Sequence, residues 1–335
     1  MEPENPGLEL MKAAGEGFGR ESSNKIFNAV SGLFPFWGLK KKAVDAYIAE
    51  IQQSDLSPEI KMMAIANSKK TFKELQNQAA IAARAYDAAK NGTDFSEASR
   101  VDDEWLSRFM DAGKHVSNET VQELWGNILA GEFESPGSTP PGIIRVMSEL
   151  TPKYAKAFSN LCSLKVMLIP SDKNRNISAI NEVVIVPNEQ DAPYLLDIDL
   201  DFHMLSEMDT LGLISFNASA EYVYRFEVSK HPYVYVYYNN ESFLVEQYKD
   251  RGFPIGRVML TDIGQTISGF VQKKEIAGHI QAVENYLLGK HSVKIDKNYK
   301  IVIEEVESET GTVYSYRTLH KEPQQKQEPQ QISEI

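Results

Sequence analysis

The sequence predicts an α+β protein in which a helical N-terminal half precedes a mixed helix–strand module. Apolar residues recur with helical spacing from Ser22 to about Cys162, whereas runs of β-branched and aromatic residues dominate after Leu164. Apolar residues make up 42% of the 335 residues and charged residues 24%. This composition is ordinary for a globular protein, so the chain can bury a core.

The pattern divides the chain into segments of different composition. Residues 1–20 carry Pro and Gly with little apolar pattern, and residues 321–335 are rich in Gln, Glu and Pro, so we expect both to be disordered. Between them we expect a helical arm at 21–100, a compact helical unit at 101–165, a mixed module at 166–290 and a β-hairpin at 291–320.

The arm contains one long predicted helix. Ser57-Pro58-Glu59 combines an N-cap residue, a proline at the first helical position and an acidic residue in the first turn. Asn91-Gly92 is a C-terminal stop for the same helix. Small residues at 79–83 would let another helix approach closely. A shorter helix is predicted before it, because apolar residues between Ala43 and Ile51 follow helical spacing.

The compact unit is predicted to hold four short amphipathic helices with short connections. A Pro-Gly-containing loop precedes the third helix, which covers residues 143–150. The predicted caps and stops of the other helices are Asp102, Gly113, Ser117, Gly131 and Thr151.

Strands and helices alternate after residue 164. The residues at 222–228 and 233–238 are rich in Val, Tyr and Phe and are predicted to pair with one another. This order of elements could form a winged-helix-like module. The other predicted elements are a strand at 183–186, a helix ending at Gly212, a helix capped by Thr261, a helix at 276–288 and a hairpin of 300–306 with 312–319.

The compact unit also carries a set of short motifs. They are Asp103-Glu104-Trp105, Leu124-Trp125, Ile128-Leu129-Ala130-Gly131-Glu132, Pro136-Gly137-Ser138 and Leu150-Thr151. These motifs resemble those of the bacterial domain-of-unknown-function family numbered 2806. Two flanking steps, Leu211 to Ile214 and Leu260 to Gly264, are similar in kind, whereas Thr139-Pro140-Pro141-Gly142 departs from the family pattern.

The resemblance implies no particular activity, because none is established for that family. The Leu-Trp-x-x-Ile-Leu-Ala stretch that begins at Leu124 is also similar to abortive-infection alpha proteins of bacterial defence. By analogy, this similarity implies a role in phage defence or in another trait of mobile elements.

Composition and motifs argue against several chemistries. The net charge of −12 disfavours a protein that binds nucleic acid over its whole surface. A single cysteine, Cys162, can form neither an internal disulfide nor a multi-cysteine zinc site. The six histidines lack metal-ligand spacing, and no phosphate-binding loop or nucleophile elbow is present. We therefore assign no catalytic, cofactor-binding or metal residues and expect no cofactor.

Several residues allow both a functional and a structural interpretation. Trp105 and Trp125 could line a pocket, but their helical spacing favours core packing. Gly131-Glu132 is better explained as a helix C-cap than as a catalytic turn. Asp197, Asp199 and Asp201 could bind a hard cation from one face of a strand, or belong to a solvated edge or a helix start. Cys162 is expected to be a buried, inert thiol.

The most unusual segment runs from Ile26 to Leu39 and is followed by three lysines. Its bulky aromatics beside a Lys triplet could lie at a membrane interface or bind an acidic partner, whereas the structural alternative is that the segment folds back onto the helices. Residues 12–90 support docking, because they hold 12 Lys/Arg and 8 Asp/Glu. This aromatic–lysine patch consists of Phe34, Phe36, Trp37, Lys40, Lys41 and Lys42.

The sequence therefore favours a non-enzymatic interaction, effector or accessory protein of a phage-defence or mobile-element system. It would dock on a protein or an anionic membrane, and could form homo-oligomers through the arm. The polar N-terminus and the lack of a long apolar run predict a cytoplasmic protein, which could also lie at the periphery of the inner membrane.

Two alternatives remain open. The first is a nucleic-acid-binding regulator that uses a winged-helix-like module between about Asp197 and Phe270. Its basic face would comprise Arg225, Lys230, Lys249, Arg251 and Arg257. The second is a hydrolase without a recognisable motif.

Overall fold

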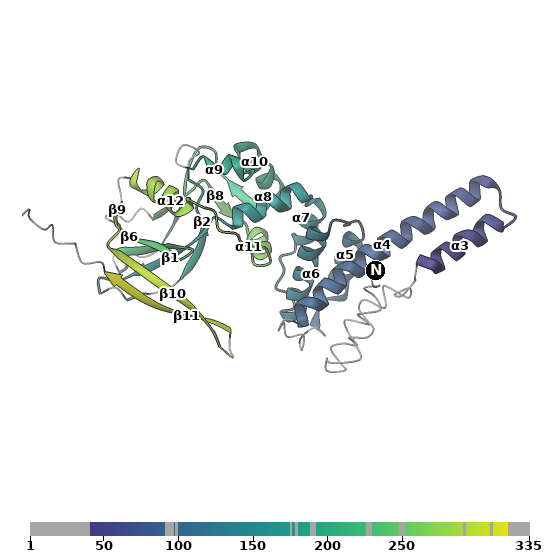
Figure 1. Cartoon of the computed structure of the whole chain (residues 1–335), viewed down its shortest axis with the longest axis horizontal. Helices are drawn as coiled ribbons and strands as arrows, with labels where there is room; N and C mark the ends of the chain where they lie inside the picture. Colours follow the sequence, from purple (N-terminus) through teal and green to yellow (C-terminus); the bar gives the residue numbers. More distant parts are fainter. Residues whose placement is uncertain are drawn as a thin grey trace, which may run out of the picture. The chain divides into compact units, whose positions relative to one another are not determined.

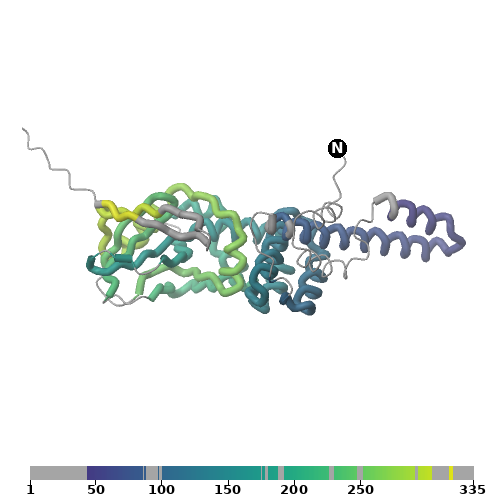
Figure 2. The backbone as a smooth tube through the Cα atoms, turned by 90° about the horizontal axis from the view of Figure 1, so that it is seen from below, coloured from purple at the N-terminus to yellow at the C-terminus, as the bar shows by residue number. Residues whose placement is uncertain are grey.

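A computed structural model confirms the α+β class, with helices before residue 163 and strands mixed with shorter helices after it. It describes residues 41–90, 97, 100–174, 176–177, 180–187, 192–225, 230–247, 252–290, 293–308 and 311–320. The chain forms two compact units, which we call the helical unit and the sheet unit (Figures 1 and 2). The helical unit comprises the chain up to Ser159 together with Met208–Leu213 and Leu260–Gln272, and the sheet unit comprises Asn160–Glu207, Ile214–Met259 and Lys273–Ile335. The segment boundaries proposed above remain predictions.

The arm is a hairpin of two helices, α3 (Lys41–Gln53) and α4 (Pro58–Lys90), which lie side by side in both views (Figures 1 and 2). The predicted start of the long helix is confirmed, and Ile60 N donates to Ser57 Oγ over 3.4 Å at its first turn. The predicted stop, Asn91-Gly92, lies outside the described residues. With 33 residues, α4 is about 50 Å long. It therefore extends from the hairpin tip into the core of the helical unit.

The second half of α4 packs against α6 (Glu119–Glu134), and glycine makes this contact possible. A Cβ atom on Gly126 would lie 2.5 Å from Cβ of Arg84 and 3.0 Å from the backbone N of Ala85. Ala82 and Ala85 are both buried at the same contact. The prediction that small residues of this helix admit a close neighbour is confirmed.

Two amide side chains of α4 also tie it to α5 (Asp103–Gly113). The Asn77 amide donates to Lys114 O over 2.8 Å, and the Gln78 amide donates to Met110 O over 2.8 Å. The last carbonyls of a helix lack partners within the helix, so the Asn77 bond gives Lys114 O a partner, whereas Met110 O accepts from Gln78 in addition to Lys114 N.

Some predicted helix ends in this unit are confirmed, and two are wrong. Asp102 caps α5 by accepting from Trp105 N over 2.7 Å. The cap of α6 is Asn118, not Ser117, because the Asn118 carboxamide oxygen accepts from Val121 N over 3.1 Å. Gly131 does not stop α6, which continues to Glu134. Gly131 is required for packing instead, because a Cβ there would lie 2.7 Å from Cζ of Phe270.

The remaining helices of the compact region follow the prediction. They are α7 (Ile143–Glu149) and α8 (Pro152–Cys162), with Thr151 before the second of them. Trp125 is fully buried and its ring lies 4.5 Å from the ring of Phe109, so the core-packing interpretation of Trp125 is confirmed.

The two steps that flank the family motifs meet in the helical unit. The chain turns at Gly212 after α10 (Phe202–Leu211), and Thr261 caps α11 (Asp262–Ser268), as predicted. The Thr261 hydroxyl donates to Gly212 O over 2.7 Å and accepts from Gly264 N over 3.0 Å. Thr261 N donates to Leu213 O over 3.2 Å. The two steps therefore form one joint, which we call the Gly212–Gly264 joint.

The sheet unit is built around a five-stranded antiparallel sheet of order β2-β1-β5-β6-β9. The prediction that residues 222–228 pair with 233–238 is wrong, because the first of these runs pairs elsewhere and the second forms a hairpin with β6. Asn239 and Asn240 make the tight turn of this hairpin with φ of 46° and 67°. Asparagine tolerates this left-handed conformation, so the two-residue turn lets β5 pair with β6, the next strand along the chain. The strands are β1 (Lys165–Ser171), β2 (Asn181–Val184), β5 (Tyr233–Tyr238), β6 (Glu241–Gln247) and β9 (Val293–Asp296).

Alternation along β5 separates two cores on the two faces of this sheet. Val234 and Val236 pack with residues of α12 (His279–Leu288), whereas Tyr235 packs with Ile301 of the terminal hairpin. The hairpin is confirmed as β10 (Tyr299–Ser308) and β11 (Gly311–His320). The helix expected from Ile276 begins three residues later, at His279.

Smaller elements complete the two units. Residues 222–224 form β4, which pairs with β7 (Phe253–Gly256), and β3 (Ile214–Phe216) pairs with β8 (Val258–Leu260). A four-residue helix, α9, covers Tyr194–Asp197. These pairings do not confirm a winged helix, because the two runs expected to form its strands belong to different sheets. Among the described residues, no helix has both the length and the apolar character needed to cross a bilayer.

Candidate functional site

The aromatic–lysine patch lies mostly outside the described residues. Phe34, Phe36, Trp37 and Lys40 belong to the part of the chain that the structure does not describe. Lys41 and Lys42 begin α3, but their side chains are also outside the description. The patch therefore stays a prediction, and the structure contributes the hairpin to which it is attached.

This hairpin exposes large apolar side chains. Eleven large apolar residues are exposed among the described residues, and five of them lie within seventeen positions of the arm. Scattered exposed apolar residues are normal on proteins, but a concentration of them marks an interaction surface. We call these five residues the arm surface: Tyr47, Leu56, Ile60, Met62 and Met63.

A small cleft lies over the family motifs in the helical unit. Its volume is about 250 Å³, which is below the usual size of a ligand pocket. Trp105 lines it while stacking on Phe109, with ring centroids 4.8 Å apart. The residues that line the cleft are Arg100, Asp102, Trp105, Glu132, Pro136, Gly137 and Thr139.

The charged groups of this cleft are already engaged within the chain. Arg100 forms an ion pair with Glu97 over 2.8 Å, and Asp102 caps α5. Glu132 is only 3% exposed, and its carboxylate accepts from Gly137 N over 2.6 Å and from Thr139 N and Oγ1 over 3.1 and 2.6 Å. Glu132 therefore clamps the loop after α6. This role of Glu132 was not predicted from the sequence, although Pro136-Gly137-Ser138-Thr139 follows it at a short distance.

A second polar cluster lies in the core of the sheet unit and centres on His279. His279 is fully buried, and its Nε2 donates to Leu164 O over 3.0 Å. Because a carbonyl can only accept, the proton is on Nε2, so Nδ1 accepts from the Tyr194 hydroxyl over 2.6 Å. The Tyr238 hydroxyl donates to Ser163 O over 3.0 Å and accepts from Ile276 N over 2.8 Å. These bonds hold the start of α12 against the segment before β1.

Burial keeps this histidine neutral. Removal from water lowers the pKa of His279 from 6.5 to about 4, despite the bond to Leu164 O. Burial also raises the pKa of Tyr194 above its usual value. Both groups are therefore uncharged at neutral pH, which is the state that the hydrogen bonds require.

The lowered pKa predicts acid lability of the sheet unit. Unfolded His279 takes up a proton below about pH 6.5, whereas the folded residue does so only near pH 4. The stability that this residue provides is therefore complete above pH 6.5 and falls as the pH drops to 4, by up to about 3 kcal/mol. Urea unfolding at pH 7.5, 5.5 and 4.5 measures it. A His279→Gln variant, which cannot titrate, should lose less stability over this range, and parallel profiles for both proteins would contradict the prediction.

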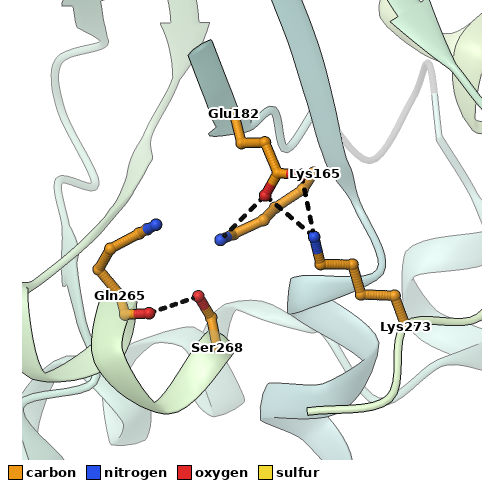
Figure 3. Close-up of polar contacts among 5 residues, drawn as sticks. All are labelled: Lys165, Glu182, Gln265, Ser268 and Lys273. Atoms are coloured by element: carbon orange, nitrogen blue, oxygen red, sulfur yellow. Dashed lines mark hydrogen bonds and ion pairs between the residues drawn. The ribbon is translucent and has the colours of Figure 1, made fainter. Parts of the chain in front are cut away.

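A charged cluster joins β1, β2 and the segment before α12 (Figure 3). Lys273 Nζ donates to the two carboxylate oxygens of Glu182, over 3.1 Å to Oε1 and 2.9 Å to Oε2. Lys165 Nζ lies 3.5 Å from Glu182 Oε2. Burial lowers the pKa of Lys165, against the opposing effect of Glu182. Burial acts to raise the pKa of Glu182, but the two ammonium groups outweigh it, so this pKa lies below its usual value. The other two residues in the figure belong to α11, where the Ser268 hydroxyl donates to Gln265 O over 2.7 Å.

The remaining candidate residues have structural roles. Cys162 is buried, and burial raises the pKa of its thiol to about 12, as expected for an inert cysteine. Asp197 ends α9, Asp199 lies in a turn with φ of 59°, and Asp201 accepts from Met204 N over 2.7 Å. They do not share a strand, and the helix-start interpretation holds for Asp201. Within the described ranges, no group of three His, Cys, Asp or Glu side chains is placed to hold a metal ion.

The chain was compared with protein families, curated proteins and solved structures. A family model described as "Protein of unknown function (DUF2806)" matches residues 65–284, about two thirds of the chain. The chain belongs to this family. No curated protein and no solved structure matches it.

The DUF2806 match confirms the resemblance drawn from the motifs of the compact unit. It begins inside α4 and ends inside α12, so it covers the Glu132 clamp and the Gly212–Gly264 joint. The aromatic–lysine patch and the arm surface lie before its first residue. In this DUF2806 protein, Trp125 and Glu132 of the family motifs have structural roles, and the exposed apolar residues of the arm lie outside the matched range.

Proposed function

We propose that this DUF2806 protein is a non-enzymatic interaction protein that docks through its helical arm. The single observation that carries this proposal is the arm surface, where five large apolar side chains remain exposed within seventeen residues. Exposed apolar surface costs free energy in water, so a concentration of it is typical of a surface that a partner covers. The arm extends from a long helix anchored in the core by Gly126, Asn77 and Gln78, and this anchoring makes it a stable support.

The docking target that fits the sequence at the base of the arm is acidic. The aromatic residues Phe34, Phe36 and Trp37 precede three lysines there. Aromatic side chains lie favourably at the interface of a bilayer, and each nearby lysine adds about 1 kcal/mol of attraction to an anionic surface. An anionic membrane or an acidic protein surface therefore suits this patch. We infer by analogy that the protein serves as an effector or accessory component of a phage-defence or mobile-element system, since its Leu124–Ala130 stretch is similar to abortive-infection alpha proteins.

Nucleic-acid binding has less support. Lys249 and Arg251, two of the five basic residues in that hypothesis, lie outside the described residues. Arg225 follows β4 and Arg257 follows β7, and because these strands are antiparallel the two arginines are at opposite ends of the pair. A docking protein therefore remains the better proposal.

Docking is tested by sedimentation with vesicles that contain phosphatidylglycerol and with neutral vesicles. Replacing Phe34, Phe36 and Trp37 with Ser should weaken binding to the anionic vesicles by at least about tenfold, because each large aromatic contributes more than 1 kcal/mol when buried. The matched control is L196S/L288S/L319S, which removes three exposed apolar side chains of the sheet unit.

The control variant should sediment with the vesicles like the wild type. A pull-down on an acidic peptide column shows whether the target is an acidic protein and not a membrane. Equal binding of the wild type and the patch variant to every surface would overturn the proposal. Absence of wild-type binding to both the vesicles and the acidic column would overturn it as well.

A further inference from the structure

The two ends of the α3–α4 hairpin carry opposite charge. The register is set at the tip, where Lys61 Nζ donates to Gln52 O over 3.0 Å. The tip, residues 50–61, contains Glu50, Asp55 and Glu59 but only one lysine. The tip therefore has a formal charge of about −2 at neutral pH.

The other end of the hairpin is basic. Residues 69–74 of α4 contain three exposed lysines, Lys69, Lys70 and Lys73, and one acid, Glu74. Since α3 runs antiparallel to α4 with Gln52 beside Lys61, the start of α3 lies toward this same end, where the exposed Asp45 adds one acid. The described side chains of this end therefore carry three positive and two negative charges. We call the two ends the acidic tip and the basic base.

The apolar residues of the arm surface lie between these ends or at the tip. Tyr47 and Met63 are 55% and 66% exposed near the middle of the hairpin, and Ile60 and Met62 are 51% and 66% exposed beside them. Methionine is unbranched and flexible, and it is common on surfaces that pack against other proteins. Tyr47, Met62 and Met63 thus lie between the acidic tip and the basic base, whereas Leu56 and Ile60 belong to the tip itself.

This distribution is self-complementary. In a twofold dimer, the surface of one copy contacts the same surface of the other, so its two ends must complement each other. Two hairpins that pair antiparallel bring the acidic tip of each copy to the basic base of the other and the apolar centres together. An apolar centre with a charged rim is also the usual composition of a protein–protein interface.

We propose that two copies of this chain associate through antiparallel pairing of their α3–α4 hairpins. The acidic tip and the basic base complement each other, which favours a second copy as the occupant of the arm surface. Glu50 and Asp55 of one copy face Lys69 and Lys73 of the second copy, and Tyr47, Ile60, Met62 and Met63 lose exposure. The inference rests on the same arm surface that carries the proposed docking and names a second copy as its occupant. The mass of the protein tests the dimer and vesicle or peptide binding tests the docking, so the two can fail separately.

Sedimentation equilibrium of the full chain tests the pairing. The wild type should be a dimer, and I60S/M62S/M63S should shift it to monomer because these exposed side chains support no core of the single chain. Two charge reversals, E50K/D55K and K69E/K73E, should each weaken the dimer about tenfold at low salt. Glu50 lies in the last turn of α3, so a lysine there favours the helix and the loss is not due to unfolding.

The decisive variant combines both reversals, E50K/D55K/K69E/K73E, and it should restore the dimer. The matched control is K274E/K294E, which makes the same charge change on exposed lysines of the sheet unit and should leave the mass unchanged. A monomeric wild type at high protein concentration would overturn the proposal. So would a dimer that the apolar variant does not weaken, or a combined variant that stays as weak as its parents.

Discussion

Gly264→Ala is expected to lower the free energy of unfolding by about 4 kcal/mol, because an added Cβ meets a closer backbone contact here than at the other described glycines. A Cβ atom at this position would lie 1.9 Å from the carbonyl oxygen of Leu213, which is backbone and cannot rotate away. The Gly212–Gly264 joint must therefore open. Thr261 would then lose its bonds to Gly212 O and Leu213 O.

This expected loss of stability is opposite to what helix propensity alone predicts for a change from glycine to alanine. Gly264 lies inside α11, where alanine is normally better than glycine by about 1 kcal/mol. The matched control is Gly289→Ala, because Gly289 has an ordinary φ of −69° and its added Cβ would meet only Tyr286 O at 3.4 Å. Urea unfolding followed by circular dichroism measures both variants. A Gly264→Ala protein as stable as Gly289→Ala would show that the joint is not tightly packed.

Glu132→Ala is expected to destabilise the helical unit by about 4 kcal/mol. Its carboxylate accepts three hydrogen bonds from Gly137 and Thr139, and each bond to a charged acceptor contributes about 1.5 kcal/mol. Alanine leaves two backbone donors and one hydroxyl of the loop without this acceptor. The conservative Glu132→Gln variant keeps the shape but not the charge, so it should lose about half as much.

Glu134→Ala is the control for this experiment, because Glu134 is exposed two residues further along the same helix. It should change the stability by no more than about 0.5 kcal/mol. Thermal unfolding of the three variants ranks them, and the expected order of stability is Glu134→Ala, Glu132→Gln, Glu132→Ala. If Glu132→Ala unfolded together with Glu134→Ala, the clamp would have no energetic importance.

The sequence was sufficient where the interaction is between near neighbours in the chain. Asp102 and Thr261 were predicted as caps and are confirmed, because a capping side chain bonds the backbone three residues ahead. The start of α4 at Pro58 and the hairpin of β10 with β11 were also predicted. The family could be identified for the same reason, since its motifs are short and contiguous.

The candidate site could be predicted only in part. The aromatic–lysine patch was predicted because bulky aromatic residues directly precede three lysines in the sequence. It stays a prediction because most of it lies outside the described residues. The arm surface was not foreseen. Met62 and Met63 look like ordinary core residues in the sequence, and their exposure depends on which side of α4 meets α3.

The sequence by itself determined the α+β class, most helix boundaries and the family, because helical spacing, caps and turns act over a few residues. Three features were decided only by the tertiary structure. They are the packing of Gly131 against Phe270, the pairing of β5 with β1, and the burial of Glu132 and His279. Gly131 is opposite Phe270 and His279 bonds Leu164, contacts that join residues more than a hundred positions apart. Such contacts depend on how whole elements pack, and no local pattern encodes them.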